Sequence, residues 1–279
     1  MFITKGYVRI TWLIALLTAL AAAGGLFIDD LYRDPETLIP IIRGQDLITL
    51  FVAPLLVFTA LEAHSGSTRG LLAYIGLLGY VLYTYTGAAF AYSFNALILV
   101  YIALFSLSIF TLVGVLVKLN AEQVREHFDA TVPRKPIVVF LLMIVFALGI
   151  GELAQIIAFY TTGELPQAMQ DIGATTYFVY VMDLGLIVPL SLLAAIWLWQ
   201  DRAWGYVLAA SMLIKAATMG LALLSMTWFA VDAGQSTDGL TLLWAVITFG
   251  GLALSFWLLK HCDRQPTTQP TVLSRKVRA

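Results

Sequence analysis

The chain has 279 residues, of which 60% are hydrophobic and only 12% are charged, and its mean hydropathy is +0.88. Soluble domains carry about 25% charged residues, so this balance indicates a membrane protein whose first partner is the lipid bilayer. The formal net charge of −1 provides no basic surface for nucleic acid, and the single cysteine, Cys262, excludes an internal disulfide and a cysteine-based metal cluster. We therefore expect no nucleic-acid partner, no metal site and no cofactor.

Eight apolar runs are long enough to cross a bilayer, which takes about 20 apolar residues per helix. They predict an all-α, polytopic bundle of eight transmembrane helices, forming a single membrane domain over residues 1–260. The predicted spans are Ile10–Ile28, Leu47–Ala63, Leu71–Ala91, Ala96–Val117, Ile137–Tyr160, Thr175–Trp199, Trp204–Phe229 and Gly239–Leu259. The first run resembles a secretory signal, but its apolar stretch is longer than a usual signal core, so we expect it to be retained.

Lysine and arginine are distributed unevenly between the two sets of loops. The opposite side carries only Arg33 and Arg43, and Lys215 lies inside a span. The amino terminus, the loops after the second, fourth and sixth spans, and the tail hold the other 13 of the 16: Lys5, Arg9, Arg69, Lys118, Arg125, Arg134, Lys135, Arg202, Lys260, Arg264, Arg275, Lys276 and Arg278. Positive charge stays on the cytoplasmic side, so both termini are predicted to be cytoplasmic. We expect a multi-pass protein of a bacterial plasma (inner) membrane.

Two polar segments lie outside the predicted spans. The connection at residues 118–136 places Val124 and Phe128 one helical turn apart, which predicts either a short helix at headgroup level or a solvated turn closed by Pro133 and Pro136. Residues 261–279 are polar and without periodicity, which predicts a disordered cytoplasmic tail.

Three ionisable residues lie inside predicted spans: Glu152, Asp183 and Lys215. A charge near the centre of a transmembrane helix costs about 2.5–3.5 kcal/mol on insertion scales, so such residues usually face the protein interior. Counted from the span ends, all three lie between the middle of the membrane and its outer third, and consecutive antiparallel helices tend to be neighbours. We expect the three to meet. Either Asp183 and Lys215 form a structural pair, or the remaining carboxyl group serves as a proton relay or cation site.

Further polar side chains are predicted at the same depth. Gln155 lies one turn beyond Glu152, Tyr180 shares a helical stripe with Asp183, and Tyr83 lies deep in the tyrosine-rich third span. A buried tyrosine hydroxyl needs a hydrogen-bond partner, whereas tyrosines of an interfacial belt face the headgroups. We expect Tyr83 to belong to the polar cluster.

Glycines and prolines inside these spans are expected to affect helix packing and helix geometry. Gly149 and Gly151 precede Glu152 and are expected to let a neighbouring helix approach closely. Pro54 and Pro189 are expected to kink the second and sixth spans and to free backbone carbonyl groups.

The sequence RGQD, residues 43–46, opens the second predicted span from the outer side. Asp46 either stabilises a helix start through the helix dipole, by about 0.3–1 kcal/mol, or forms an outward-facing binding rim with Arg43. Both interpretations remain open.

The segments RGQDLITLFVAPLL and GYVLYTYTGAAFAYSFNALILVYIALFSLS resemble a group of uncharacterised bacterial polytopic integral membrane proteins. The resemblance is strongest over residues 43–113. It implies that the RGQD sequence and the tyrosine-rich third span belong together, and it implies no activity.

These patterns predict an outward-facing polar pocket with Glu152, Asp183 and Lys215 at its floor and Asp46 and Tyr83 at its mouth. The corresponding function is a transporter of a small solute, coupled to a proton or cation from the outer side. Two alternatives are a non-enzymatic membrane scaffold or accessory subunit, and a membrane-embedded enzyme acting on a lipid or quinone. The chain has no HExxH, GxSxG or phosphate-binding glycine sequence, which favours a protein that is not an enzyme.

Overall fold

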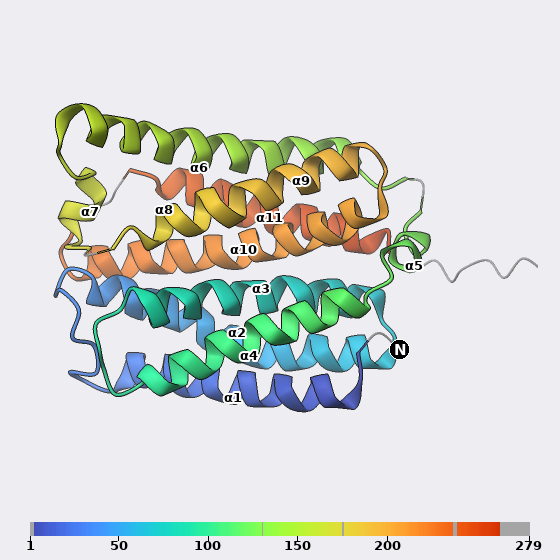
Figure 1. The fold of residues 1–279 in the computed structure, drawn as a ribbon, viewed down its shortest axis with the longest axis horizontal. Coiled ribbons are helices and arrows are strands. Elements are labelled where there is room, and N and C mark those ends of the chain that lie inside the picture. The colour runs from blue at the N-terminus through green and yellow to red at the C-terminus, as the bar shows by residue number, and fades with distance from the viewer. Residues whose placement is uncertain (1–2, 130, 175, 237–238, 263–279) are drawn as a thin grey trace, which may run out of the picture.

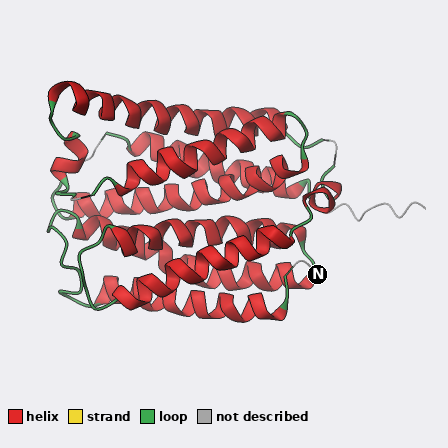
Figure 2. Cartoon of the chain, viewed as in Figure 1, coloured by secondary structure: helices red, strands yellow, loops and turns green. Residues whose placement is uncertain are grey.

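The computed structural model describes residues 3–129, 131–174, 176–236 and 239–262. These residues are helical apart from loops and one isolated bridge between Phe128 and Cys262 (Figures 1 and 2). A π-helical segment, η1, interrupts the sixth span. The elements are α1 (Lys5–Phe27), α2 (Ile39–Ser65), α3 (Thr68–Phe90), α4 (Ile98–Lys118), α5 (Ala121–Glu126), α6 (Arg134–Thr162), α7 (Gln167–Asp171), α8 (Phe178–Met182), η1 (Asp183–Ile187), α9 (Val188–Trp199), α10 (Ala203–Asp232) and α11 (Thr241–Lys260).

The prediction of an all-α bundle with eight spans is confirmed for the described part of the chain. Eight helices are long and apolar enough to cross a membrane, with α8, η1 and α9 together forming the span Phe178–Trp199. The span boundaries lie within five residues of the predicted ones, except at the start of α2. That helix begins at Ile39 rather than Leu47, and Pro40 lies in its first turn, where the missing N–H of proline costs nothing.

The bundle consists of two halves, α1–α4 and α6–α11, which lie one above the other in Figure 1. Helix α10 joins them, because it packs against α2 and α3 of the first half and against α9 and α11 of the second. The amino terminus and α5 lie at one end of the bundle, here called the N-terminal end, and α7 lies at the opposite one, the α7 end. At the N-terminal end, Arg69 of α3 donates a 2.7 Å hydrogen bond to the carbonyl of Cys262 after α11.

The junction between the halves depends on a close approach of α2 to α10. A Cβ atom at Gly44 would lie 2.5 Å from Cα of Met226, so only glycine allows this spacing. Small residues at helix contacts are the usual means of close packing in membranes, where the apolar lipid removes most of the hydrophobic drive for association.

Helix α5 confirms the short helix that is one of the two predictions for residues 118–136, but its apolar face packs on the protein rather than at headgroup level. Val124 is fully buried, and the ring of Phe128 lies 4.9 Å from that of Tyr206 in α10. Asp201, between α9 and α10, binds Arg125 of α5 at 2.5 Å and Arg134 of α6 at 2.9 Å. The predicted disordered tail lies, from residue 263 onward, outside the described residues.

Candidate functional site

A cavity of about 320 Å³ lies at the junction of the two halves. Helices α2 and α3 line it on one side, and α6, the sixth span, α10 and α11 line it on the other. Ile172, Ala174 and Thr176, from the loop between α7 and α8, line its α7 end. The cavity therefore extends from the middle of the bundle toward one end.

Glu152, Asp183 and Lys215 all line this cavity, as the sequence predicts. They come from α6, η1 and α10, and each is at most 9% exposed. Most of the remaining lining is apolar, so the three ionisable groups form the charged part of an otherwise hydrophobic chamber.

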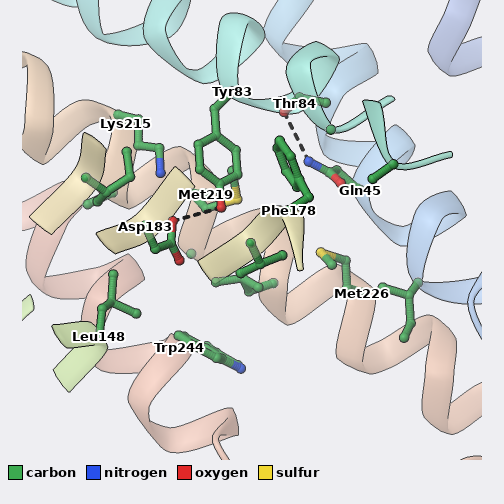
Figure 3. Close-up of a pocket in the computed structure, with 18 of the residues that line it drawn as sticks. Gln45, Tyr83, Thr84, Leu148, Phe178, Asp183, Lys215, Met219, Met226 and Trp244 are labelled. Atoms are coloured by element: carbon green, nitrogen blue, oxygen red, sulfur yellow. Dashed lines mark hydrogen bonds between the residues drawn. The ribbon is translucent and has the colours of Figure 1, made fainter. Parts of the chain in front are cut away.

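Tyr83 of α3 connects Asp183 with Lys215. Its hydroxyl donates a 2.8 Å hydrogen bond to Oδ1 of Asp183, and its ring centre lies 4.0 Å from Nζ of Lys215. Figure 3 shows Lys215 beside the ring and Asp183 at its hydroxyl end. Among the described residues, no carboxylate lies within 4.0 Å of the Lys215 ammonium, so the expected pairing of Asp183 with Lys215 is indirect.

Glu152 has one carboxyl oxygen that receives no hydrogen bond within the described part of the chain. Its Oε2 atom is buried and accepts no hydrogen bond from any described residue. Asp183, the other acid of the cavity, lies close enough for its side chain to interact with the Glu152 carboxyl group. Of the two acids, Glu152 is therefore the one with an unsatisfied oxygen among the described residues.

The backbone around Asp183 is a π-helix, in which each turn contains about one extra residue. The N–H of Val188 donates to the carbonyl of Asp183, five residues earlier. Pro189 follows at once and has no N–H to donate to the carbonyl of Gly185, so the bonding of this turn is weakened further. Short π-helical turns inside α-helices occur frequently at functional sites.

Gln155 and Tyr180 form a pair beside the cavity without lining it. The hydroxyl of Tyr180 donates a 2.9 Å hydrogen bond to Oε1 of Gln155, linking α8 to α6. Beyond Glu152, none of the described side chains of α6 is buried. The Gln155–Tyr180 contact therefore holds α8 against the part of α6 that packs least.

Asp46 and Arg43 do not join the cavity, which corrects the prediction that Asp46 lines its mouth. Asp46 lies two turns inside α2, so it is also not a helix-start residue. It is buried and accepts a 2.5 Å hydrogen bond from the hydroxyl of Tyr32. Burial and the nearby Asp46 charge raise the pKa of the Tyr32 phenol far above its usual value. Arg43 pairs instead with the exposed Asp29 at 3.5 Å.

The glycines before Glu152 do not bring a helix into close contact, so that expectation is wrong. A Cβ at Gly149 would make only ordinary contacts with Val188, at 3.7 Å or more, and a Cβ at Gly151 would meet nothing within 4 Å. The polar cluster is therefore held by the contacts of Tyr83, not by small residues on α6.

Gln45 of the RGQD sequence does line the cavity, and its amide donates a 3.0 Å hydrogen bond to Thr84 (Figure 3). Two aromatic lining residues, by contrast, carry no signal in the sequence. Phe178 packs edge-on against Tyr83 (Figure 3). Trp244 lines the cavity from α11. Aromatic residues are common in apolar spans, so nothing distinguishes these from lipid-facing ones before the helices are placed.

Comparison of the chain with protein-family models, curated protein sequences and solved structures gives no match. In the described part of the chain, no group of three histidine, cysteine, aspartate or glutamate side chains is arranged to hold a metal ion. Assignment of a function therefore depends on the cavity and on four of its polar residues: Glu152, Asp183, Lys215 and Tyr83.

Proposed function

We propose that this multi-pass membrane protein is a carrier for a small, largely apolar solute, and that it couples solute movement to a proton at Glu152 and Asp183. The observation that supports this proposal is the convergence of two acids, one lysine and one tyrosine in a single buried cavity. Membrane-embedded ionisable groups that face a cavity are typical of proton and ion pathways.

The uneven distribution of lysine and arginine supports an orientation in which the α7 end faces the outside and both termini lie in the cytoplasm. The cavity would then be loaded from the outer side, through the loop between α7 and α8. In a bacterium the corresponding location is the plasma membrane.

A purely structural role for the charged cluster fits the contacts less well. A cluster that only locked the helices together would satisfy both carboxyl groups, because an unpaired buried polar atom costs about 1–3 kcal/mol. Glu152 Oε2 has no partner among the described residues. A group that exchanges a proton or binds a solute has a reason to keep this atom available.

Proteoliposomes containing the purified full chain and a trapped pH-sensitive dye test the proposal. Three probes share an aromatic body and differ in charge: benzyltrimethylammonium, phenylacetate and phenylacetamide. We expect at least one of them to drive proton movement, with the response lost in Glu152→Gln and strongly reduced in Asp183→Asn. Glu164→Gln, an exposed acid at the α7 end, is the matched control and should keep the response. An unchanged response in Glu152→Gln, or no response to any probe, would contradict the carrier.

A further inference from the structure

The charges around the cavity do not balance. Its described lining contains two acids, Glu152 and Asp183, and one base, Lys215. Asp183 has the Tyr83 hydroxyl as donor, and Lys215 has the Tyr83 ring and the charge of Asp183. Glu152 is left with a bare carboxyl oxygen. When both acids and Lys215 are ionised, the cavity carries one net negative charge, and Glu152 has the carboxyl oxygen that no described donor satisfies.

The rest of the lining favours an organic cation over a metal ion. Phe178 and Trp244 supply aromatic surface, and Met212, Met219 and Met226 supply polarisable thioethers. Cations are attracted to aromatic faces, and methionine adapts to irregular apolar shapes. A hard metal ion such as Ca²⁺ takes six to eight oxygen ligands, far more than Glu152 and its neighbours offer.

From these observations we propose that the cargo is a small organic monocation with an apolar body, which binds at Glu152 in exchange for one proton. This inference rests on the carrier proposed above and names the class of its solute. The exchange balances: the protonated carboxyl group and the free cation become a carboxylate–cation pair and a released proton.

Four titratable groups lie around Glu152 on the neighbouring elements and must be counted in its pH response. They are Asp183 of η1, Tyr180 of α8, Tyr83 of α3 and Lys215 of α10. Asp183 interacts with Glu152 directly, and Lys215 lies across the Tyr83 ring from Asp183. Both tyrosines are neutral donors at ordinary pH. Cation affinity should therefore fall as the pH is lowered, because protons compete for the same carboxyl group.

Calorimetric titration of the full chain in detergent tests the inference, with benzyltrimethylammonium as the cation and phenylacetate as the anion of similar body. We expect the cation to bind at least tenfold more tightly than the anion. Titrations in two buffers of different ionisation heat should report about one proton released per cation. At low pH the cation affinity should fall by about tenfold per pH unit, as linkage requires.

Variants separate the site from general effects. Glu152→Gln should weaken cation binding at least tenfold and abolish proton release, whereas Glu152→Asp should retain both in part. Glu164→Gln should bind as the unmodified chain does, and a melting curve for each variant confirms folding. Unchanged binding in Glu152→Gln, absence of cation binding, or preferred binding of phenylacetate that is lost in Lys215→Gln would each overturn the inference.

The two proposals fail in different ways. If the cation binds and a proton is released, but no proton movement across the liposome membrane follows, the carrier proposal is contradicted and the cation site still stands. If phenylacetate or phenylacetamide drives proton movement and the cation does not, the carrier proposal stands and the proposal of a cationic solute is contradicted.

Discussion

The hydroxyl of Tyr83 donates a 2.8 Å hydrogen bond to the carboxylate of Asp183. The ring of the same tyrosine faces the Lys215 ammonium at 4.0 Å, so one side chain serves an acid and a base at once. Tyr83 thereby joins the α1–α4 half of the bundle to η1 and α10 of the other half.

Tyr83→Phe should lower stability because Asp183 loses its donor while the ring beneath Lys215 remains. A buried group left without its hydrogen bond costs about 1–3 kcal/mol. Thermal unfolding in detergent measures the loss. Tyr80→Phe on the same helix is the control, since the described hydrogen-bonding neighbours of the Tyr80 hydroxyl are all neutral, Thr49 at 2.8 Å together with Thr84 and Gln45, and its loss should cost about 1 kcal/mol. Equal losses in the two variants would contradict a special role for Tyr83.

Glu152→Leu should leave stability unchanged or increase it, whereas Asp183→Leu should lower it. Replacing Glu152 removes an unsatisfied buried carboxyl oxygen, so the melting temperature should stay the same or rise. Replacing Asp183 leaves the Tyr83 hydroxyl without its acceptor and the Lys215 ammonium without the nearby negative charge of Asp183. The free energy of unfolding should therefore fall by about 3 kcal/mol or more. Both variants should lose proton coupling. A large destabilisation by Glu152→Leu would instead indicate that this acid holds the bundle together.

The sequence predicts the spans, and with them the depth of the charged residues, because run length and hydropathy reflect the thickness of the bilayer directly. It also predicts that Glu152, Asp183 and Lys215 meet, since neighbouring antiparallel helices place equal depths side by side. It does not predict that Tyr83 lies between Asp183 and Lys215. That arrangement depends on how each helix is rotated about its axis, and in spans that are apolar all round no amphipathic pattern sets this rotation.

Asp46 illustrates a second limit. The RGQD sequence resembles a helix start, but Pro40 already marks the first turn of α2 one helical turn before Arg43. The position of this proline places Asp46 inside the helix. The Tyr32 partner of Asp46 comes from a loop, where no periodicity indicates which way a side chain points.

Gly25→Ala should be strongly destabilising, whereas Gly24→Ala should be tolerated. A Cβ atom at Gly25 would collide with Oδ2 of Asp46 and the hydroxyl of Tyr32, while one at Gly24 would sit 3.5 Å from its nearest neighbours. Overpacking of this kind costs about 1–3 kcal/mol, and breaking the Tyr32–Asp46 bond adds to it. Unfolding curves of the two variants provide the comparison. Similar stability for both would contradict the tight packing around Asp46.

The Asp201 cluster should make stability depend on pH in the acid range. Burial raises the pKa of the Asp201 carboxyl, but the Tyr206 and Arg125 hydrogen bonds and the charges of Arg125 and Arg134 outweigh this effect and hold it below its usual value. A lowered pKa in the folded state stabilises the protein above the pKa of the unfolded chain, about 3.9, and this contribution disappears as the pH falls through the folded-state pKa. The melting temperature should therefore drop on acidification below about pH 4.

Asp201→Asn isolates this charge effect. Asp201 has a positive φ of 60°, and asparagine adopts that conformation as readily as aspartate, so the backbone should be preserved. The variant should melt lower than the unmodified chain near neutral pH and show less change below pH 4. Parallel curves for the two proteins across this range would mean that Asp201 does not contribute through its charge.

The π-helical turn at Asp183–Ile187 gives the sixth span one residue more than a regular helix would need. Each residue of an α-helix turns the chain by about 100° about its axis. Removing Gly185, whose position is open, would let the span close into a continuous α-helix and would swing Asp183 about a quarter turn away from Tyr83. The orientation of the Asp183 carboxylate is thus set by the number of residues in the span as well as by their identity. A one-residue deletion would separate Asp183 from Tyr83 and Lys215 without changing any polar side chain of the cluster.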